Sequence, residues 1–143
     1  HSKGTPADMQ DNPSYLDLVS EILKYFDESI SSLEEAGVKK ENIILDPGIG
    51  FGKTFEHNLE IINRLNEFKC FGLPLCIGVS RKSFIGEILK ENSPVNRDYG
   101  TAAAMAIAIS KKVDIIRIHN VPFMKEISLV SDAIIRRKED DKD

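Results

Sequence analysis

Apolar residues recur at helical spacing in the first quarter of the chain. They follow one another at alternating steps of four and three, the pattern of an amphipathic helix, at Val19, Leu23, Phe26, Ile30 and Leu33. We expect this helix to begin at Asn12-Pro13, where an N-cap residue precedes a proline at the first helical position, and to end near Gly37.

Three short apolar runs, bounded by turn residues, have the character of buried strands. They cover residues 42–45, 74–79 and 115–118. Helical patterns separate and follow them. Thr54 caps a helix with apolar residues at Leu59, Ile61, Ile62, Leu65 and Phe68. Ser83 caps a shorter helix through Leu89, and Pro94 breaks it. An alanine-rich helix spans 97–110, and Pro122 opens a last helix that turns Met124, Ile127, Val130, Ala133 and Ile134 inward.

The alternation of apolar strands with helices predicts an α/β fold made of parallel βα units. Periodicity leaves open whether these units belong to a (β/α)8 barrel or to a doubly wound sheet. A barrel needs eight strands and about 250 residues, whereas this chain has 143 residues and three predicted strands. If the fold is a barrel, about half of it lies outside this sequence.

Composition favours a small-molecule partner over a nucleic acid or a membrane. The net charge is −4 and the basic residues are dispersed, so no basic stripe predicts a nucleic-acid groove. The longest apolar stretch, 102–109, is too short to cross a bilayer. Two cysteines and no signal peptide fit a reducing cytoplasm. We expect the mixed charges of 138–143 to form a disordered tail, and the initial His1 suggests that an upstream part is absent.

Polar residues gather just beyond the carboxyl end of each predicted strand. Asp46 follows the first strand, residues 80–83 follow the second, and Arg117 and His119 lie on the third. In a βα barrel these ends share one face, and active sites are built there. The sequence therefore predicts a single site with contributions from all three units.

Asp46 precedes a glycine-rich turn, 47–52, whose backbone can approach a ligand closely. A carboxylate at this depth suits a ring that offers paired N–H donors. The alternative is an Asx turn, in which the carboxylate accepts hydrogen bonds from nearby backbone amides.

The run Ser80-Arg81-Lys82-Ser83 places two cations and two hydroxyl groups where a strand meets a helix, which favours an anion. The alternative is that Ser83 only caps the helix and the cations are solvated.

Arg117 and His119 alternate along a strand, so they share a face while Ile116 and Ile118 take the other. This pair suggests a phosphate or pyrophosphate clamp. The alternative is that backbone carbonyl groups satisfy both side chains. We interpret His57 as a residue of a first helical turn and Cys76 as core.

Segments 45–53, 78–86 and 116–119 together resemble the dihydropteroate synthase family, in the right order and with compatible spacing. Residues 1–10 resemble that family's loop after its fifth strand. The resemblance covers only the family's C-terminal half. It implies a partial TIM (β/α)8 barrel, in which the three predicted strands are strands six to eight.

The resemblance also implies site roles. Asp46, Lys82 and Arg117 would bind the pterin, and Arg117 and His119 would hold pyrophosphate. Lys82, Arg117 and His119 would be the catalytic residues. The site for p-aminobenzoate, where sulfonamides would compete, would be bordered by Gly50, Phe51 and Ser83.

The reaction implied is substitution at the pterin methylene group, in which p-aminobenzoate displaces pyrophosphate. Mg²⁺ would assist, bound by the N-terminal half rather than by this chain, and the full-length protein would be a homodimer through the outer faces of its last helices. Asn120 stands where the family usually has Asp. Because the first half of the barrel is absent, we expect this chain alone to be inactive. A pterin-binding methyltransferase domain and a non-catalytic half-barrel module are the alternatives.

Overall fold

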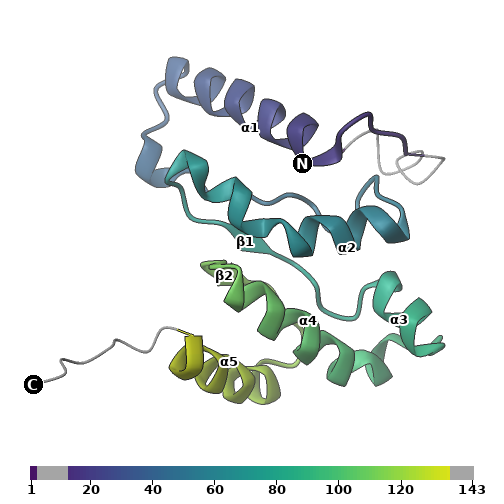
Figure 1. Cartoon of the computed structure of the whole chain (residues 1–143). Helices are drawn as coiled ribbons and strands as arrows, with labels where there is room; N and C mark the ends of the chain where they lie inside the picture. Colours follow the sequence, from purple (N-terminus) through teal and green to yellow (C-terminus); the bar gives the residue numbers. More distant parts are fainter. Residues whose placement is uncertain (3–12, 136–143) are drawn as a thin grey trace, which may run out of the picture.

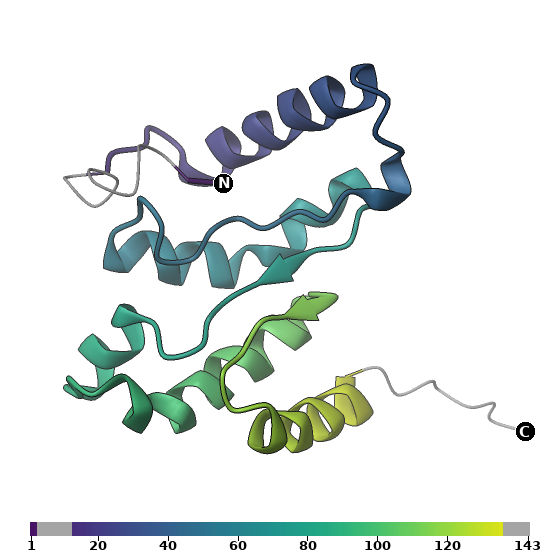
Figure 2. The same ribbon diagram turned by 180° about the vertical axis from the view of Figure 1, so that it is seen from behind.

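Three strand segments run parallel and side by side, with helices on one face (Figure 1). The computed structural model describes residues 1–2 and 13–135. β1 (Cys76–Ile77) pairs with β2 (Ile115–Ile116), and an isolated bridge joins Leu45 to Leu75 on the other side. The predicted α/β class with parallel units is therefore confirmed. Figure 2 shows the strands in front of the helices, and no described helix covers this second face.

The strands are shorter than the sequence pattern predicts. Of residues 42–45 only Leu45 makes a bridge, and the runs 74–79 and 115–118 keep two strand residues each. Ile43 and Leu45 are buried against the helices, but Ile44 is 55% exposed. The prediction that this whole run is buried is wrong, because side chains alternate along an extended segment and Ile44 points away from the face that Ile43 and Leu45 bury.

Helix α1 (Leu18–Glu35) begins later than predicted. Its N-cap is Asp17, whose carboxylate accepts a hydrogen bond from the Ser20 amide at 2.9 Å. Pro13 is not helical, and Asn12 lies outside the described residues. The helix ends before Gly37, as predicted, and buries one face. Leu33, in its last turn, is 40% exposed rather than inward-facing.

The middle helices agree with their predicted caps only in part. Thr54 caps α2 (Phe55–Asn63): its Oγ1 accepts from the His57 backbone N–H, and His57 Nδ1 accepts from the Thr54 backbone N–H, which completes a capping box. A 3₁₀ segment (Leu65–Phe71) follows. Leu59 is exposed, whereas Ile61, Ile62, Leu65 and Phe68 are buried. Helix α3 (Ser83–Leu89) starts at Ser83, so this residue is not the cap; Lys82 holds the N-cap position and makes no side-chain cap hydrogen bond.

The last two helices pack against each other and against β2. After a 3₁₀ turn (Pro94–Arg97), α4 (Asp98–Ser110) approaches its neighbours closely, since a Cβ at Gly100 would lie 2.4 Å from Ile85 Cγ2. In α5 (Val121–Ile135), Met124 and Ser131 are buried and Ile127 is half-buried. Val130, Ala133 and Ile134 are exposed, so their predicted inward orientation is wrong: α5 contacts its neighbours along the 124–127–131 face only.

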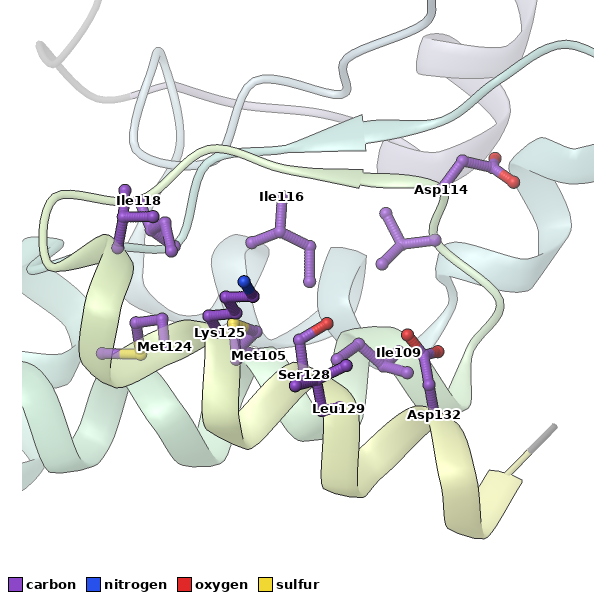
Figure 3. A pocket seen from close by; sticks show the side chains of 12 residues that line it. Met105, Ile109, Asp114, Ile116, Ile118, Met124, Lys125, Ser128, Leu129 and Asp132 are labelled. Carbon is purple, nitrogen blue, oxygen red and sulfur yellow. The ribbon is translucent and has the colours of Figure 1, made fainter. Parts of the chain in front are cut away.

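A cavity of about 260 Å³ lies between β2, α4 and α5. Figure 3 shows Ile116 and Ile118 reaching from the third strand toward these helices, with Met105 and Met124 nearby. The even-numbered residues of this strand therefore face the helices. This arrangement confirms the predicted alternation and leaves Arg117 and His119 for the opposite face.

The hydrophobic core lies between the strands and the helices. Phe68 is fully buried and packs edge to face against Phe26, with ring centroids 5.8 Å apart. Leu75, Ile77 and Val79 are also fully buried, so the middle strand is the centre of the core. Within the described residues, no helix is both long and apolar enough to cross a membrane.

Two isoleucines on neighbouring chain segments give a matched test of this layering. Ile77→Ala should lower the free energy of unfolding by about 2–5 kcal/mol because it opens a cavity in the core. Ile44→Ala, on the uncovered face, should cost less than about 1 kcal/mol. Denaturant unfolding of both variants measures the difference. Equal losses would contradict the one-sided core.

Candidate functional site

The parallel register brings the predicted polar residues together at the carboxyl ends of the strands. Ile77 pairs with Ile116, so Gly78 lies opposite Arg117 and Ser80 lies near His119. These residues, with Lys82 and Ile118, line a pocket of about 500 Å³. Asp46 follows the bridge residue Leu45 at the same end. The structure thus gathers side chains from all three units, as the sequence pattern predicted.

Gly78 leaves the space that the Arg117 side chain occupies. A Cβ at Gly78 would lie 2.5 Å from Arg117 Nη2 and 2.9 Å from Cζ. The guanidinium therefore lies directly against the backbone of the middle strand. It donates no hydrogen bond to a carbonyl group of another described residue, so the alternative of an internally satisfied arginine is wrong.

His119 is held by one buried serine. The His119 backbone N–H donates to Ser80 Oγ at 3.2 Å, and His119 Nδ1 lies 2.9 Å from the same oxygen. Ser80 is 6% exposed. The imidazole orientation is thus fixed by a hydroxyl group, and Nε2 is the ring nitrogen that this contact leaves for a ligand.

Lys82 packs across the glycine-rich loop. Its Nζ lies 4.0 Å from the centroid of the Phe51 ring, a cation–π distance. A Cβ at Gly50, where φ is +78°, would approach the Lys82 side chain to 3.1 Å. Burial, followed by the positive charge of Arg117, lowers the pKa of Lys82, and the negative charge of Asp46 opposes this effect. Gly50, Phe51 and Lys82 therefore form one wall, and Ser83 is exposed beside it.

Asp46 forms the Asx turn that the sequence offered as an alternative. Its Oδ1 accepts the backbone N–H of Gly48 at 2.8 Å. No other described residue donates a hydrogen bond to this carboxylate, and the residue is only half-buried. The turn therefore orients the carboxylate while Oδ2 stays available for a ligand.

Lys53, which the sequence interpretation overlooked, lies under the same loop. It is 4% exposed, and its Nζ donates to the Phe51 carbonyl at 2.9 Å. Nζ also lies 3.2 Å from His1 Nδ1 and 3.4 Å from the His1 carbonyl oxygen. Burial lowers the pKa of Lys53 to about 8, and the charge of Asp46 opposes the shift. A lysine directly after three closely spaced glycines was the available signal.

Arg81 points away from the pocket and forms an ion pair with Asp98. Arg81 Nε and Nη2 lie 2.8 and 3.1 Å from the two carboxylate oxygens. Asn120 Nδ2 also donates to Asp98 Oδ2, at 2.8 Å. Hydrogen bonds from Arg81 and then from Asn120 lower the pKa of Asp98 to about 2. Of the two predicted cations at 81 and 82, only Lys82 lines the pocket, and Arg81 is paired rather than solvated.

The described residues do not form a metal site. No three His, Cys, Asp or Glu side chains in this part of the chain are placed to hold one ion. The expectation that Mg²⁺ takes its ligands from the N-terminal half stays a prediction.

Comparison with known proteins gives consistent matches. The profile of the pterin binding enzyme family matches residues 1–119. Dihydropteroate synthases of Synechocystis sp. and Escherichia coli are 44% and 43% identical over 136 and 139 residues. These matches cover 95% and 97% of this chain but 47% and 49% of the relatives, so the chain spans about half the length of the curated relatives it matches.

A solved structure also matches nearly all of this chain and about half of its own length. The Yersinia pestis dihydropteroate synthase in complex with a sulfonamide drug superposes with a TM-score of 0.93 at 37% identity. The match covers 96% of this chain and 50% of that one. Dihydropteroate synthases are TIM-barrel enzymes, and the three strands described above correspond to part of such a fold.

The buried Lys53 predicts a pH dependence of stability. Below pH 8 the folded state carries the full cost of burying a charged lysine. Between pH 8 and about 10.5 the unfolded state binds more protons, so stability should rise by up to about 3 kcal/mol. Lys53→Met should reduce this rise, because methionine does not titrate and only the contribution of Lys82, whose pKa is also lowered, remains.

Urea unfolding at several pH values measures the effect. The control is Lys24→Met, at an exposed lysine, which should keep the rise. Parallel curves for the wild type and Lys53→Met would contradict the assignment.

Proposed function

Because this chain belongs to the pterin binding enzyme family, we propose that it supplies the C-terminal half of a dihydropteroate synthase. The enzyme would condense 6-hydroxymethyl-7,8-dihydropterin pyrophosphate with p-aminobenzoate to give 7,8-dihydropteroate and pyrophosphate. The observation that carries the proposal is the pocket at the strand ends, where Lys82, Arg117 and His119 meet beside the Asp46 carboxylate.

The three strands would be strands six to eight of the barrel. Their uncovered face, with Ile44 and Arg117, would line the barrel interior, and the outer strand edges would pair with strands of the missing N-terminal half. That half is therefore the first partner of this chain. A second copy would cover exposed apolar residues on the last helices, such as Ile107 and Ile134.

The pterin would be held by charge and shape together. The Asx turn fixes one oxygen of Asp46, so the other can accept paired N–H groups of the aminopyrimidine ring. Lys82 and Arg117 both line the pocket, and the positive charge of Arg117 contributes to the lowered pKa of Lys82. Their mutual repulsion would be relieved by an anionic ligand, which the pyrophosphate of the substrate provides.

The chemistry is a substitution with little proton transfer by the protein. The C–O bond to pyrophosphate breaks, and pyrophosphate leaves with the electron pair. The amine nitrogen of p-aminobenzoate forms the new C–N bond and loses a proton to water. Arg117 and the Nε2 of His119 would stabilise the negative charge that develops on the leaving group.

The p-aminobenzoate would lie against Gly50, Phe51 and Ser83. The Phe51 ring is 37% exposed, and Lys82 covers it from one side. The sulfonamide complex of the Yersinia relative supports an arylamine site in this family. Mg²⁺ would be held outside the described residues of this chain, so no step here is assigned to it.

Pterin-dependent methyl transfer, the alternative reading, is less well supported. The named relatives are dihydropteroate synthases. The pocket also concentrates cationic and donor groups at Lys82, Arg117 and His119, which suit a pyrophosphate leaving group better than a methyl donor.

A hybrid protein tests the proposal. Residues 1–143 replace the matching half of the Escherichia coli relative, and formation of dihydropteroate is measured. The hybrid should be active, and the 143-residue chain alone should not. A folded hybrid that makes no dihydropteroate would contradict the proposal.

Gly78→Ala in this hybrid tests the Arg117 position. The new Cβ would displace the guanidinium, so kcat/KM should fall at least about tenfold. The change should have little further effect in an Arg117→Ala background, because the two changes act on the same group. Independent, additive losses would show that Gly78 acts in another way.

A further inference from the structure

Behind the pocket, the Asp98 carboxylate accepts hydrogen bonds from two loops. One of these loops carries Lys82 and the other carries His119. Asp98 begins α4, and its two oxygens accept from Arg81 on one side and from Asn120 on the other. Arg81 precedes Lys82 in the chain, and Asn120 follows His119. Each ligand-facing residue is thus the immediate neighbour of a residue held by Asp98.

The loop that carries Lys82 is tied to the start of α4 at several points. The Arg81 backbone N–H donates to Thr101 Oγ1 at 3.0 Å. Arg97 Nη1 donates to the carbonyl oxygens of Arg81 at 3.1 Å and Lys82 at 3.4 Å. Arg81 adopts a φ of +58°, which is unusual for a residue with a side chain. This turn sends Arg81 toward Asp98 and Lys82 toward the pocket.

The loop that carries His119 has two ties. In front, Ser80 contacts the backbone N–H and Nδ1 of His119. Behind, the Asn120 amide reaches Asp98. The carboxylate that Asn120 reaches is itself held by Arg81 in a charge-assisted, two-pronged pair, whose side chains are 22% and 18% exposed. The rear connection therefore joins the His119 loop, through Asp98, to the loop that carries Lys82.

Asp98 is not used to cap its own helix. The N-cap position of α4 is Arg97, which makes no side-chain cap hydrogen bond. Within the described residues, the hydrogen-bond partners of the Asp98 carboxylate are both on other segments, at positions 81 and 120. Loss of this carboxylate should therefore loosen the two loops more than the helix.

We propose that Asp98 is a positioning residue that sets the separation of Lys82 and His119 across the pocket by holding Arg81 and Asn120 together. The inference rests on the proposed function only for the identity of the anion that binds between Lys82 and His119. Asn120 is the suitable partner because an amide can donate to Asp98. An aspartate at 120 would place two carboxylates in contact and separate the loops.

Amide hydrogen exchange of the 143-residue chain tests this role without a ligand, so its outcome is independent of the proposed function. In Asp98→Ala, protection of the Arg81 and His119 amides should fall at least about tenfold. The amides of Cys76 and Arg117, which bond to Leu45 and Ile77, should change less than about threefold. Unchanged loop protection, or an equal loss at all four amides, would overturn the proposal.

An exchange of the two side chains provides the control. Asn120→Asp alone should lower protection at Arg81 and His119, because two carboxylates then face each other. The double variant Asp98→Asn with Asn120→Asp keeps one carboxylate and one amide at this contact, so it should recover part of the loss. A double variant no better protected than the Asn120→Asp variant would overturn the role of the 98–120 contact.

Discussion

The parallel register of three strand segments is the constraint on which the site depends. Pairing of Leu45 with Leu75 and of Cys76 with Ile115 brings three chain segments to the same level, so their next residues emerge at one end. A shift by one residue would exchange the two faces of a strand and bury Arg117 among the helices. The fully buried Leu75 and Ile77 oppose such a shift, because they would be moved out of the core.

The second feature is the separation of charges around the pocket. Arg81 is neutralised behind it by Asp98, and Lys53 is buried below it near Asp46. Lys82 and Arg117 remain on the pocket side with His119, where an anion can bind between them. Packing thus decides which cations serve the structure and which are available to a ligand, although all of them lie close to the strand ends.

Sequence reasoning identified what depends on local pattern. The strand-end positions of Asp46, Lys82, Arg117 and His119, and the Thr54 cap, follow from short motifs. It failed where distant packing decides: Ile44 and Ile134 are exposed because no described element covers them. Asp98 was missed because its partners lie 17 and 22 residues away. Lys53 was missed although it follows three closely spaced glycines, because its burial depends on packing that this motif does not specify.

The central claim is that these three βα units preform the pterin and pyrophosphate side of the site. Calorimetric titration of the 143-residue chain with 6-hydroxymethyl-7,8-dihydropterin pyrophosphate and Mg²⁺, alongside Asp46→Asn, tests it most directly. The account predicts binding by the wild-type chain that is lost in the variant, while both proteins unfold at the same urea concentration. A folded wild-type chain that does not bind, or a variant that binds equally well, would contradict it.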